Sequence, residues 1–183
     1  MNILAISGSL RTASYNRKAL QIAKRIAADL GAEVQEIDLR ELNLPIFDQD
    51  IQDKGMPESV LKFKSACEAA DALLIASPEY NYSISAALKN ALDWASRSGN
   101  SLGGKIAAIF GASTGRIGTA RGQMHLRQVL MSLNVIVTPQ PQVYVSMADD
   151  AFNPDGSLKD PKVHEQLQKL VTNTLTLAQK LKS

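Results

Sequence analysis

Serine, asparagine and arginine side chains are concentrated in one short segment near the start of the chain, residues 7–16. The segment follows an apolar run and precedes a helical pattern, so we expect a buried strand, a tight turn and a helix start. A helix start offers unpaired N–H groups and the positive end of a dipole, which together hold an anion. Ser9, Ser14 and Asn16 add hydrogen-bond donors, and Arg11 adds a fixed positive charge. The segment therefore predicts a site for a phosphate monoester, although an ordinary capped turn shares several of these features.

Two tyrosines mark a second unusual segment, residues 77–83, which also follows a short apolar run. Pro78, Tyr80 and Tyr82 offer flat apolar surface, while Asn81 and the loop backbone offer hydrogen bonds. A planar heteroaromatic ring needs this mixture, because its faces require apolar cover and its edges require polar partners. The alternative is a turn whose aromatic rings only cover the edge of a sheet.

A third segment, residues 111–118, is rich in glycine and again follows an apolar run. Ser113, Thr114 and Gly115 permit a close approach between the backbone and a ligand. They could flank the same ring or the pyrophosphate of a second ligand, and a plain helix N-terminus would read the same way.

The elements that must position these segments alternate regularly between strand and helix. We expect strands at residues 2–7, 33–38, 72–76, 105–110 and 135–137, the last interrupted by two prolines and continued at 143–145. We expect helices at residues 16–30, 57–69, 85–97, 119–133 and 161–181, with a longer connection at 39–56.

This alternation predicts an α/β fold of the flavodoxin-like, doubly wound type, with a five-stranded parallel sheet and helices on both faces. The strand order of that type is 2-1-3-4-5. In this order the loops after strands 1, 3 and 4 meet at the carboxyl edge of the sheet, where ligands bind. We expect one domain that spans residues 1–183.

Composition excludes several classes of protein. The chain is 45% hydrophobic and 21% charged with a net charge of +2, so it reads as an ordinary globular domain without a nucleic-acid partner. No apolar run approaches the roughly 20 residues that cross a bilayer, and no basic segment precedes the apolar start. We therefore expect a cytoplasmic protein that does not bind membranes.

Cysteine and histidine usage points away from metal and thiol chemistry. Cys67 is the single cysteine, which excludes an internal disulfide, and its apolar helical context predicts a buried, inert thiol. His125 and His164 lie far apart without acidic or cysteine neighbours at metal-ligand spacing, so no metal site is expected.

Three other kinds of site found in α/β folds lack their required residues here. A dinucleotide site needs Gly-x-Gly-x-x-Gly after the first strand, although Asp38 stands where a ribose-binding acid would be. A receiver domain needs acidic residues after that strand, and a P-loop needs a lysine.

The three loop motifs together resemble the NADPH-dependent FMN reductase family, in its chromate and quinone reductase branch. The resemblance is carried by Gly8-Ser9-Leu10-Arg11-x-x-Ser14-Tyr15-Asn16, by Pro78-Glu79-Tyr80-Asn81, by Leu88-Lys89-Asn90-Ala91-x-Asp93-Trp94, by Ser113-Thr114-Gly115 and by His125-Leu126-Arg127-Gln128. It covers nearly the whole chain, and the spacing between the motifs agrees with that of the family. One departure is Thr119, which stands where many relatives have glycine.

The resemblance implies bound FMN and assigns residues to its parts. The residues expected around the phosphate are Ser9, Leu10, Arg11, Ser14, Tyr15 and Asn16. Those expected along the isoalloxazine ring are Pro78, Glu79, Tyr80 and Asn81, with Ser113, Thr114 and Gly115 on its far side. We interpret Asn90, Asp93 and Trp94 as packing and hydrogen bonding beneath the loop at 77–83.

The implied activity is a ping-pong reductase, in which NADPH or NADH passes a hydride to flavin N5 and an oxidised acceptor then takes its place. Expected acceptors are quinones, azo compounds, free flavins and chromate-like oxyanions. Because the flavin does the bond chemistry, we name no catalytic residue, and we expect Glu79 to serve a helix N-terminus.

Two other functions stay open at this point. A flavodoxin-type electron carrier has no substrate of its own, but such carriers are strongly acidic and this chain is nearly neutral. A nucleotide-binding regulator would be colourless and would turn over nothing. The resemblance also implies a homodimer or homotetramer, for which the apolar helix at residues 124–133 is a candidate interface, although core packing explains that helix equally well.

Overall fold

A computed structural model describes residues 1–182, so the last residue of the predicted domain, Ser183, lies outside the described residues. Its strands are β1 (Asn2–Ser7), β2 (Glu33–Ile37), β3 (Ala72–Ala76), β4 (Ile106–Ala112), β5 (Ile136–Val137) and β6 (Val143–Val145). Its helices are α1 (Tyr15–Asp29), α2 (Leu39–Leu42), α3 (Gln49–Asp53), α4 (Glu58–Ala69), α5 (Ala86–Ala95), α6 (Ala120–Ser132) and α7 (Pro161–Lys182). The strands form a parallel sheet in the order β2-β1-β3-β4-β5, which confirms the predicted flavodoxin-like order.

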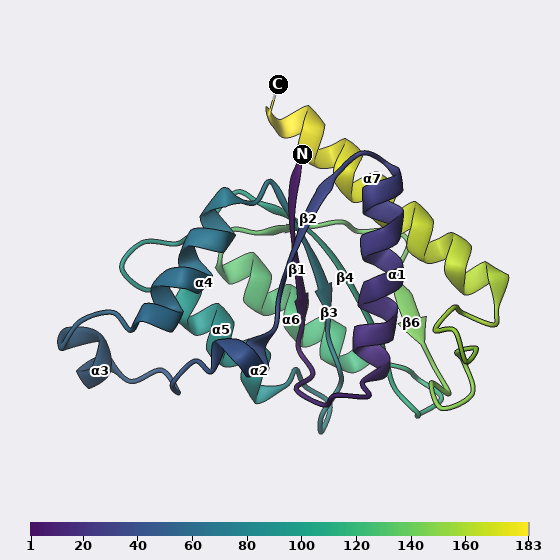
Figure 1. The fold of residues 1–183 in the computed structure, drawn as a ribbon, viewed down its shortest axis with the longest axis horizontal. Coiled ribbons are helices and arrows are strands. Elements are labelled where there is room, and N and C mark those ends of the chain that lie inside the picture. Colours follow the sequence, from purple (N-terminus) through teal and green to yellow (C-terminus); the bar gives the residue numbers. More distant parts are fainter. Residues whose placement is uncertain (183) are drawn as a thin grey trace.

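Alternate side chains of the central strands point to opposite faces of the sheet, and both faces are covered. Ile3, Leu74 and Phe110 pack with α1 and α7, which lie together on one face (Figure 1). Leu4 and Ile75, on the other face, pack with α4, α5 and α6. Burial on both faces explains why these strands read as continuous apolar runs rather than as alternating patterns.

The fifth strand position is filled by two short strands instead of one. β5 pairs with Ile106 and Ala107 of β4, and β6 pairs with Phe110 to Ala112 of the same strand. Between them the chain contains two prolines and a cis Gln140–Pro141 peptide bond. Proline has no N–H for a sheet ladder, so the strand stops and restarts. The predicted interruption of the fifth strand, with its continuation at residues 143–145, is confirmed, and the sheet has six strands in five positions.

The connection between β2 and α4 contains the short helices α2 and α3 and extends away from the sheet at the left of Figure 1. It is anchored to α5 at Pro45 and Phe47. Asn90 Nδ2 and Trp94 Nε1 both donate to the Pro45 carbonyl, at 2.8 and 2.7 Å, and Asn90 Oδ1 accepts from Phe47 N at 2.8 Å. These side chains therefore hold the 39–57 connection and not the loop at 77–83 as we predicted, while Asp93 forms an ion pair within α5.

A buried lysine of α4 closes the carboxyl end of α5. Lys64 Nζ donates to the carbonyl oxygens of Ala95, Arg97 and Gly99 at 3.0, 2.8 and 2.6 Å. These acceptors lie at and just beyond the last turn of α5, where carbonyl groups have no partner within the helix. Burial of the ammonium group lowers the pKa of Lys64.

The one thiol of the chain, Cys67, is fully buried on α4. Burial raises its pKa to about 12, which confirms the prediction of an inert thiol. Across residues 1–182, no three histidine, cysteine or acidic side chains come together as a group that could hold a metal ion. Over the same residues, every helix is too short or too polar to cross a membrane.

Candidate functional site

The three segments singled out in the sequence lie together at the carboxyl edge of the sheet, the lower edge in Figure 1. We call residues 8–14 the phosphate loop, residues 77–83 the aromatic loop and residues 113–119 the glycine loop. Gly8 N donates to the Ala76 carbonyl at 2.8 Å, and Ser85 Oγ donates to the Gly8 carbonyl at 2.6 Å. These bonds tie the phosphate loop to the end of β3 and to the start of α5, on either side of the aromatic loop.

The phosphate loop presents a set of hydrogen-bond donors at the start of α1. The hydroxyl-bearing residues Ser9 and Ser14 are buried, and Ser14 Oγ caps α1 by accepting from the N–H groups of Asn16 and Arg17 at 3.2 and 3.4 Å. Among the described residues, no protein group accepts from the N–H groups of Thr12 and Ala13. Free N–H groups, serine hydroxyls and the helix dipole are the donor set that a phosphate monoester needs.

Any residue larger than glycine would be crowded at the first position of this loop. A Cβ on Gly8 would lie 3.1 Å from Pro78 Cδ and 3.2 Å from Leu88 Cβ. The phosphate loop can therefore lie directly against the aromatic loop, which brings the two predicted parts of the site together.

Asn16 fixes α1 to the end of β4. Its Nδ2 donates to the Ala112 carbonyl and its Oδ1 accepts from Ala112 N, both at 2.9 Å, in a buried position. The pair uses only one of the two amide hydrogens of Asn16. Asn16 can therefore hold the loop in place and still donate a second hydrogen bond to a ligand.

Replacing Asn16 by alanine should lower the free energy of unfolding by about 2 kcal/mol, because both backbone groups of Ala112 lose their buried partner. Urea denaturation followed by circular dichroism measures the change. Gln21→Ala on the exposed face of the same helix is the control, with an expected loss below about 0.5 kcal/mol. Equal effects of the two substitutions would contradict the role of Asn16.

Basic residues surround the phosphate loop. Arg11 is exposed, and its guanidinium carbon lies 4.9 Å from the centre of the Tyr15 ring, beside the N-terminus of α1. Arg17 Nη2 forms an ion pair with Asp38 Oδ1 at 2.6 Å, and Asp38 also caps α2. Asp38 is therefore already paired with a cation and with the N-terminus of α2, which disfavours a ribose-binding role. The Arg17 hydrogen bond lowers the pKa of Asp38.

This lowered pKa predicts a loss of stability in acid. A carboxyl group whose pKa is lower in the folded state stabilises the protein fully above its unfolded pKa, about 4, and this contribution disappears as the pH falls through the folded pKa. The pair is about four-fifths buried, and we expect about 1 kcal/mol between wild type and Asp38→Asn above about pH 5. Urea melts at pH 7, 5 and 3 should show this difference shrinking at pH 3, and a constant difference would refute the prediction. Asp29→Asn, at an exposed position of α1, is the control.

The aromatic loop is a tight hairpin. Tyr80 N donates to the Ser83 carbonyl at 2.9 Å, and Ser83 N donates back to the Tyr80 carbonyl at 3.0 Å. Asn81 and Tyr82 have φ values of 49° and 67°, which define a type I′ turn. Left-handed backbone is rare for a bulky residue, and such positions cluster at functional sites. The side chains of Tyr80 and Tyr82 remain more than half exposed, so flat apolar surface faces outward at this edge.

Three residues of helix α6 contact the aromatic loop. Glu79 Oε2 accepts from Gly122 N at 2.8 Å in the first turn of α6, which confirms the expected helix N-terminal role of this carboxylate. His125 Nδ1 lies 3.2 Å from Ser83 Oγ, and the Arg121 guanidinium carbon lies 4.2 Å from the centre of the Tyr82 ring. Arg121 and His125 are four residues apart, so they lie on the same face of α6. This spacing in the sequence could have indicated that both residues contact the same loop.

The glycine loop turns tightly at the end of β4. Gly115 N donates to Ser113 Oγ at 3.2 Å, and Gly118 N donates to the Gly115 carbonyl at 3.1 Å. Thr114 and Gly115 are exposed. Thr119 has a φ of −116°, which any residue adopts, so threonine replaces glycine here without backbone strain.

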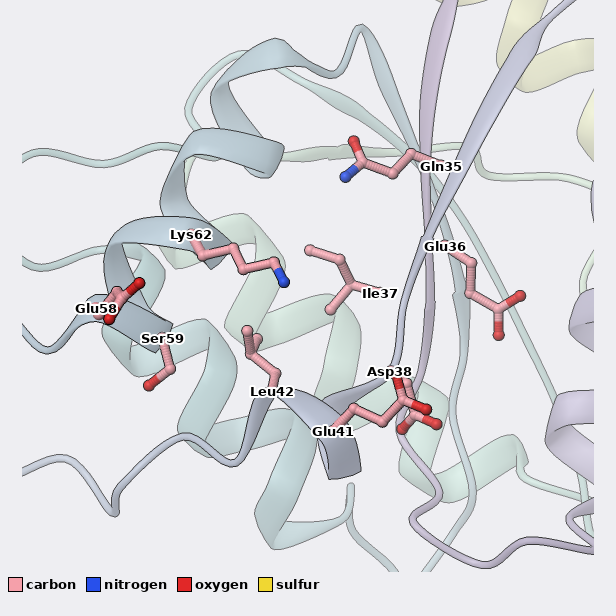
Figure 2. Close-up of a pocket in the computed structure, with 9 residues that line it drawn as sticks. All are labelled: Gln35, Glu36, Ile37, Asp38, Glu41, Leu42, Glu58, Ser59 and Lys62. Atoms are coloured by element: carbon pink, nitrogen blue, oxygen red, sulfur yellow. The ribbon is translucent and has the colours of Figure 1, made fainter.

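A hollow of about 460 Å³ lies elsewhere, beside the edge strand β2 and between α2 and α4 (Figure 2). Lys62 is the one cation among its lining residues, which are Gln35, Glu36, Ile37, Asp38, Glu41, Leu42, Glu58, Ser59 and Lys62. Carboxylates outnumber the cation, so this hollow disfavours a phosphate group. The edge with the three loops is the better candidate.

The structure thus brings every predicted site residue to one edge of the sheet, where the hydrogen-bond donors at the start of α1 lie next to a flat, partly exposed surface. The predicted residues still exposed toward solvent are Leu10, Arg11, Tyr80, Asn81, Thr114 and Gly115. Such an edge can hold a ligand that has a phosphate at one end and a planar ring at the other.

Comparisons with known proteins identify the family. The model of the NADPH-dependent FMN reductase family matches residues 1–150. The chain is 46% identical over 169 residues to an NAD(P)H-dependent FMN reductase of Pseudomonas aeruginosa, covering 92% of this chain and 90% of that protein. It is 39% identical over 171 residues to a 2-hydroxy-1,4-benzoquinone reductase of Burkholderia sp., covering 92% and 91%.

A solved structure agrees with these sequences. FerB, a flavoenzyme NAD(P)H:(acceptor) oxidoreductase from Paracoccus denitrificans, superposes with a TM-score of 0.87 at 34% identity, covering 98% of this chain and 97% of that chain. The resemblance carried by the loop motifs is therefore confirmed, and this chain belongs to the NADPH-dependent FMN reductase family.

Proposed function

We propose that this protein is an FMN-dependent oxidoreductase that uses NADPH or NADH to reduce quinones. The observation that carries the proposal is the pairing, at one sheet edge, of unpartnered N–H groups at the start of α1 with the exposed tyrosines of the aromatic loop. Family membership and the quinone-reducing relative support it. The electron-carrier and regulator alternatives have no such support.

The residues proposed to hold the cofactor form two groups, one for its phosphate and one for its ring. Those proposed to bind the phosphate are Ser9, Leu10, Arg11, Ser14, Tyr15 and Asn16. Those proposed to line the ring are Pro78, Glu79, Tyr80, Asn81, Ser113, Thr114 and Gly115. Glu79 acts through its bond to α6, which fixes the hairpin, while the tyrosines exclude water from the apolar part of the ring.

Bound FMN supplies the redox chemistry, with ring atom N5 as the position that takes up a hydride. A ring held between the exposed tyrosines and the exposed glycine loop would have one face accessible to other molecules. A donor and an acceptor that share one face must bind in turn, which gives ping-pong kinetics. Flat acceptors such as azo compounds and free flavins fit this surface as well as quinones do, and small oxyanions such as chromate can reach it too.

Anaerobic mixing of the flavin-loaded protein with NADPH or NADH tests the function. The visible flavin absorbance should bleach, and it should return on addition of a benzoquinone. Initial rates measured against both substrates should give parallel double-reciprocal lines. A flavin that neither nucleotide bleaches would favour an electron carrier, and a protein that binds no FMN would overturn the proposal.

Assembly and location are further parts of the proposal. We propose a homodimer or homotetramer in the cytoplasm with small-molecule partners alone. On α6, Met124 and Met131 are 55% and 72% exposed, and apolar exposure of this size on one helix favours contact with a second copy. Light scattering coupled to size-exclusion chromatography gives the subunit number.

A further inference from the structure

Arg40 connects the turn after β2 to the phosphate loop. It lies in the first turn of α2, where its N–H group donates to Asp38 Oδ1 at 2.8 Å. Its guanidinium reaches back across 30 residues of sequence to the Leu10 carbonyl. Nε donates to that oxygen at 2.7 Å, and Nη2 donates to the same oxygen. Arg40 stands outside every motif that carries the family resemblance.

The contact fixes the orientation of one peptide unit in the loop. The Leu10 carbonyl and the Arg11 N–H belong to the same planar trans peptide, so they point in opposite directions. With the oxygen held on the Arg40 side, the Arg11 N–H points the other way and donates to Oγ of the buried Ser9 at 3.4 Å. If this peptide were turned over, a carbonyl oxygen would face an incoming phosphate and repel it.

The charge of Arg40 is also available to an anion. Arg17, the other arginine next to this loop and α2, is neutralised by its ion pair with Asp38. Arg40 binds a neutral carbonyl instead, and no carboxylate in residues 1–182 forms an ion pair with it. Its full positive charge therefore lies against the loop that is proposed to bind a phosphate dianion.

We infer that Arg40 is a positioning residue for the FMN phosphate, which keeps the Leu10–Arg11 peptide turned with its N–H inward and adds positive charge to the loop. This inference rests on the proposed function, because it assumes that the loop holds the phosphate of FMN. It predicts that Arg40 matters for FMN and not for riboflavin, which has the same ring and no phosphate.

Fluorescence titration of the apoprotein with FMN and with riboflavin tests the inference without any turnover. Arg40→Ala should raise the Kd for FMN about tenfold, as expected for loss of a charge-assisted contact, and should leave the Kd for riboflavin within about twofold. Arg40→Lys keeps the charge but cannot present the paired N–H groups of a guanidinium, so it should recover part of the FMN affinity. Arg25→Ala, an exposed arginine near the far end of α1, removes the same charge and should change neither Kd.

The outcomes separate the inference from the function on which it rests. An unchanged Kd for FMN in Arg40→Ala, or equal losses for FMN and riboflavin, would overturn the role of Arg40 while the proposed function stands. Full recovery of FMN affinity in Arg40→Lys would overturn the peptide-orienting role. A wild-type protein that binds neither flavin would overturn the proposed function itself.

Discussion

Gly111→Ala should destabilise the protein by about 3 kcal/mol or more, or prevent folding altogether. A Cβ at this position of β4 would lie 2.2 Å from the Ser77 carbonyl oxygen and 2.4 Å from Thr119 Oγ1. The Ser77 oxygen is part of the backbone where β3 passes into the aromatic loop, so it cannot rotate away as a side chain would. Relief of the clash must separate the aromatic loop from β4, and FMN affinity should fall together with stability.

Gly115→Ala is the matched control for this prediction. A Cβ at Gly115 has Ser113 Oγ as its nearest neighbour, 3.6 Å away, which is ordinary van der Waals contact. Thermal melts of the two variants, with the yield of folded protein, measure the contrast. A Gly111→Ala protein as stable as Gly115→Ala would mean that the aromatic loop and the glycine loop are not packed against Gly111 of β4 as the structure shows.

The second large effect is expected for Lys64→Met, which should cost about 3 kcal/mol of unfolding free energy. Methionine fills a similar volume but donates no hydrogen bond, so three carbonyl groups at the end of α5 lose their common partner. The Ala95 carbonyl keeps its bonds from Ser101 N and Oγ, so the cost falls mainly on the partly buried bonds to the carbonyls of Arg97 and Gly99, which lose a charged donor.

Lys62→Met tests whether the effect belongs to the buried position. Lys62 lies two residues away on the same helix and is exposed, so the same substitution should change stability by less than about 0.5 kcal/mol. Urea denaturation of both variants gives the two values. Equal losses would show that Lys64 acts through general helix charge and not through its three carbonyl acceptors.

Strong periodic signals explain why most of the fold was predictable. The run at residues 72–76 is apolar throughout because β3 is covered on both faces, and its predicted bounds agree with the structure. Gly31 has a φ of 81° just beyond α1, where left-handed backbone ends a helix. The short helices α2 and α3 were missed because four or five residues are too few to show a helical period.

The site was predictable in its location but not in its internal contacts. Loop composition and strand order together place the three loops at one edge, since parallel strands end on the same side. Which side chains are bound to other parts of the protein depends on long-range pairs. Asn16 meets Ala112 across 96 residues, and Glu79 meets Gly122 across 43. No local pattern in the sequence encodes such pairs.

The deep burial of Cys67 has a chemical consequence for an enzyme of this family. Electron-poor quinone rings alkylate proteins through thiolate attack, and a thiol with a pKa of about 12 is almost entirely protonated at neutral pH. The sulfur is also sealed within the core, away from solvent. The chain can therefore meet electrophilic compounds without being modified at this sulfur as long as its core stays closed.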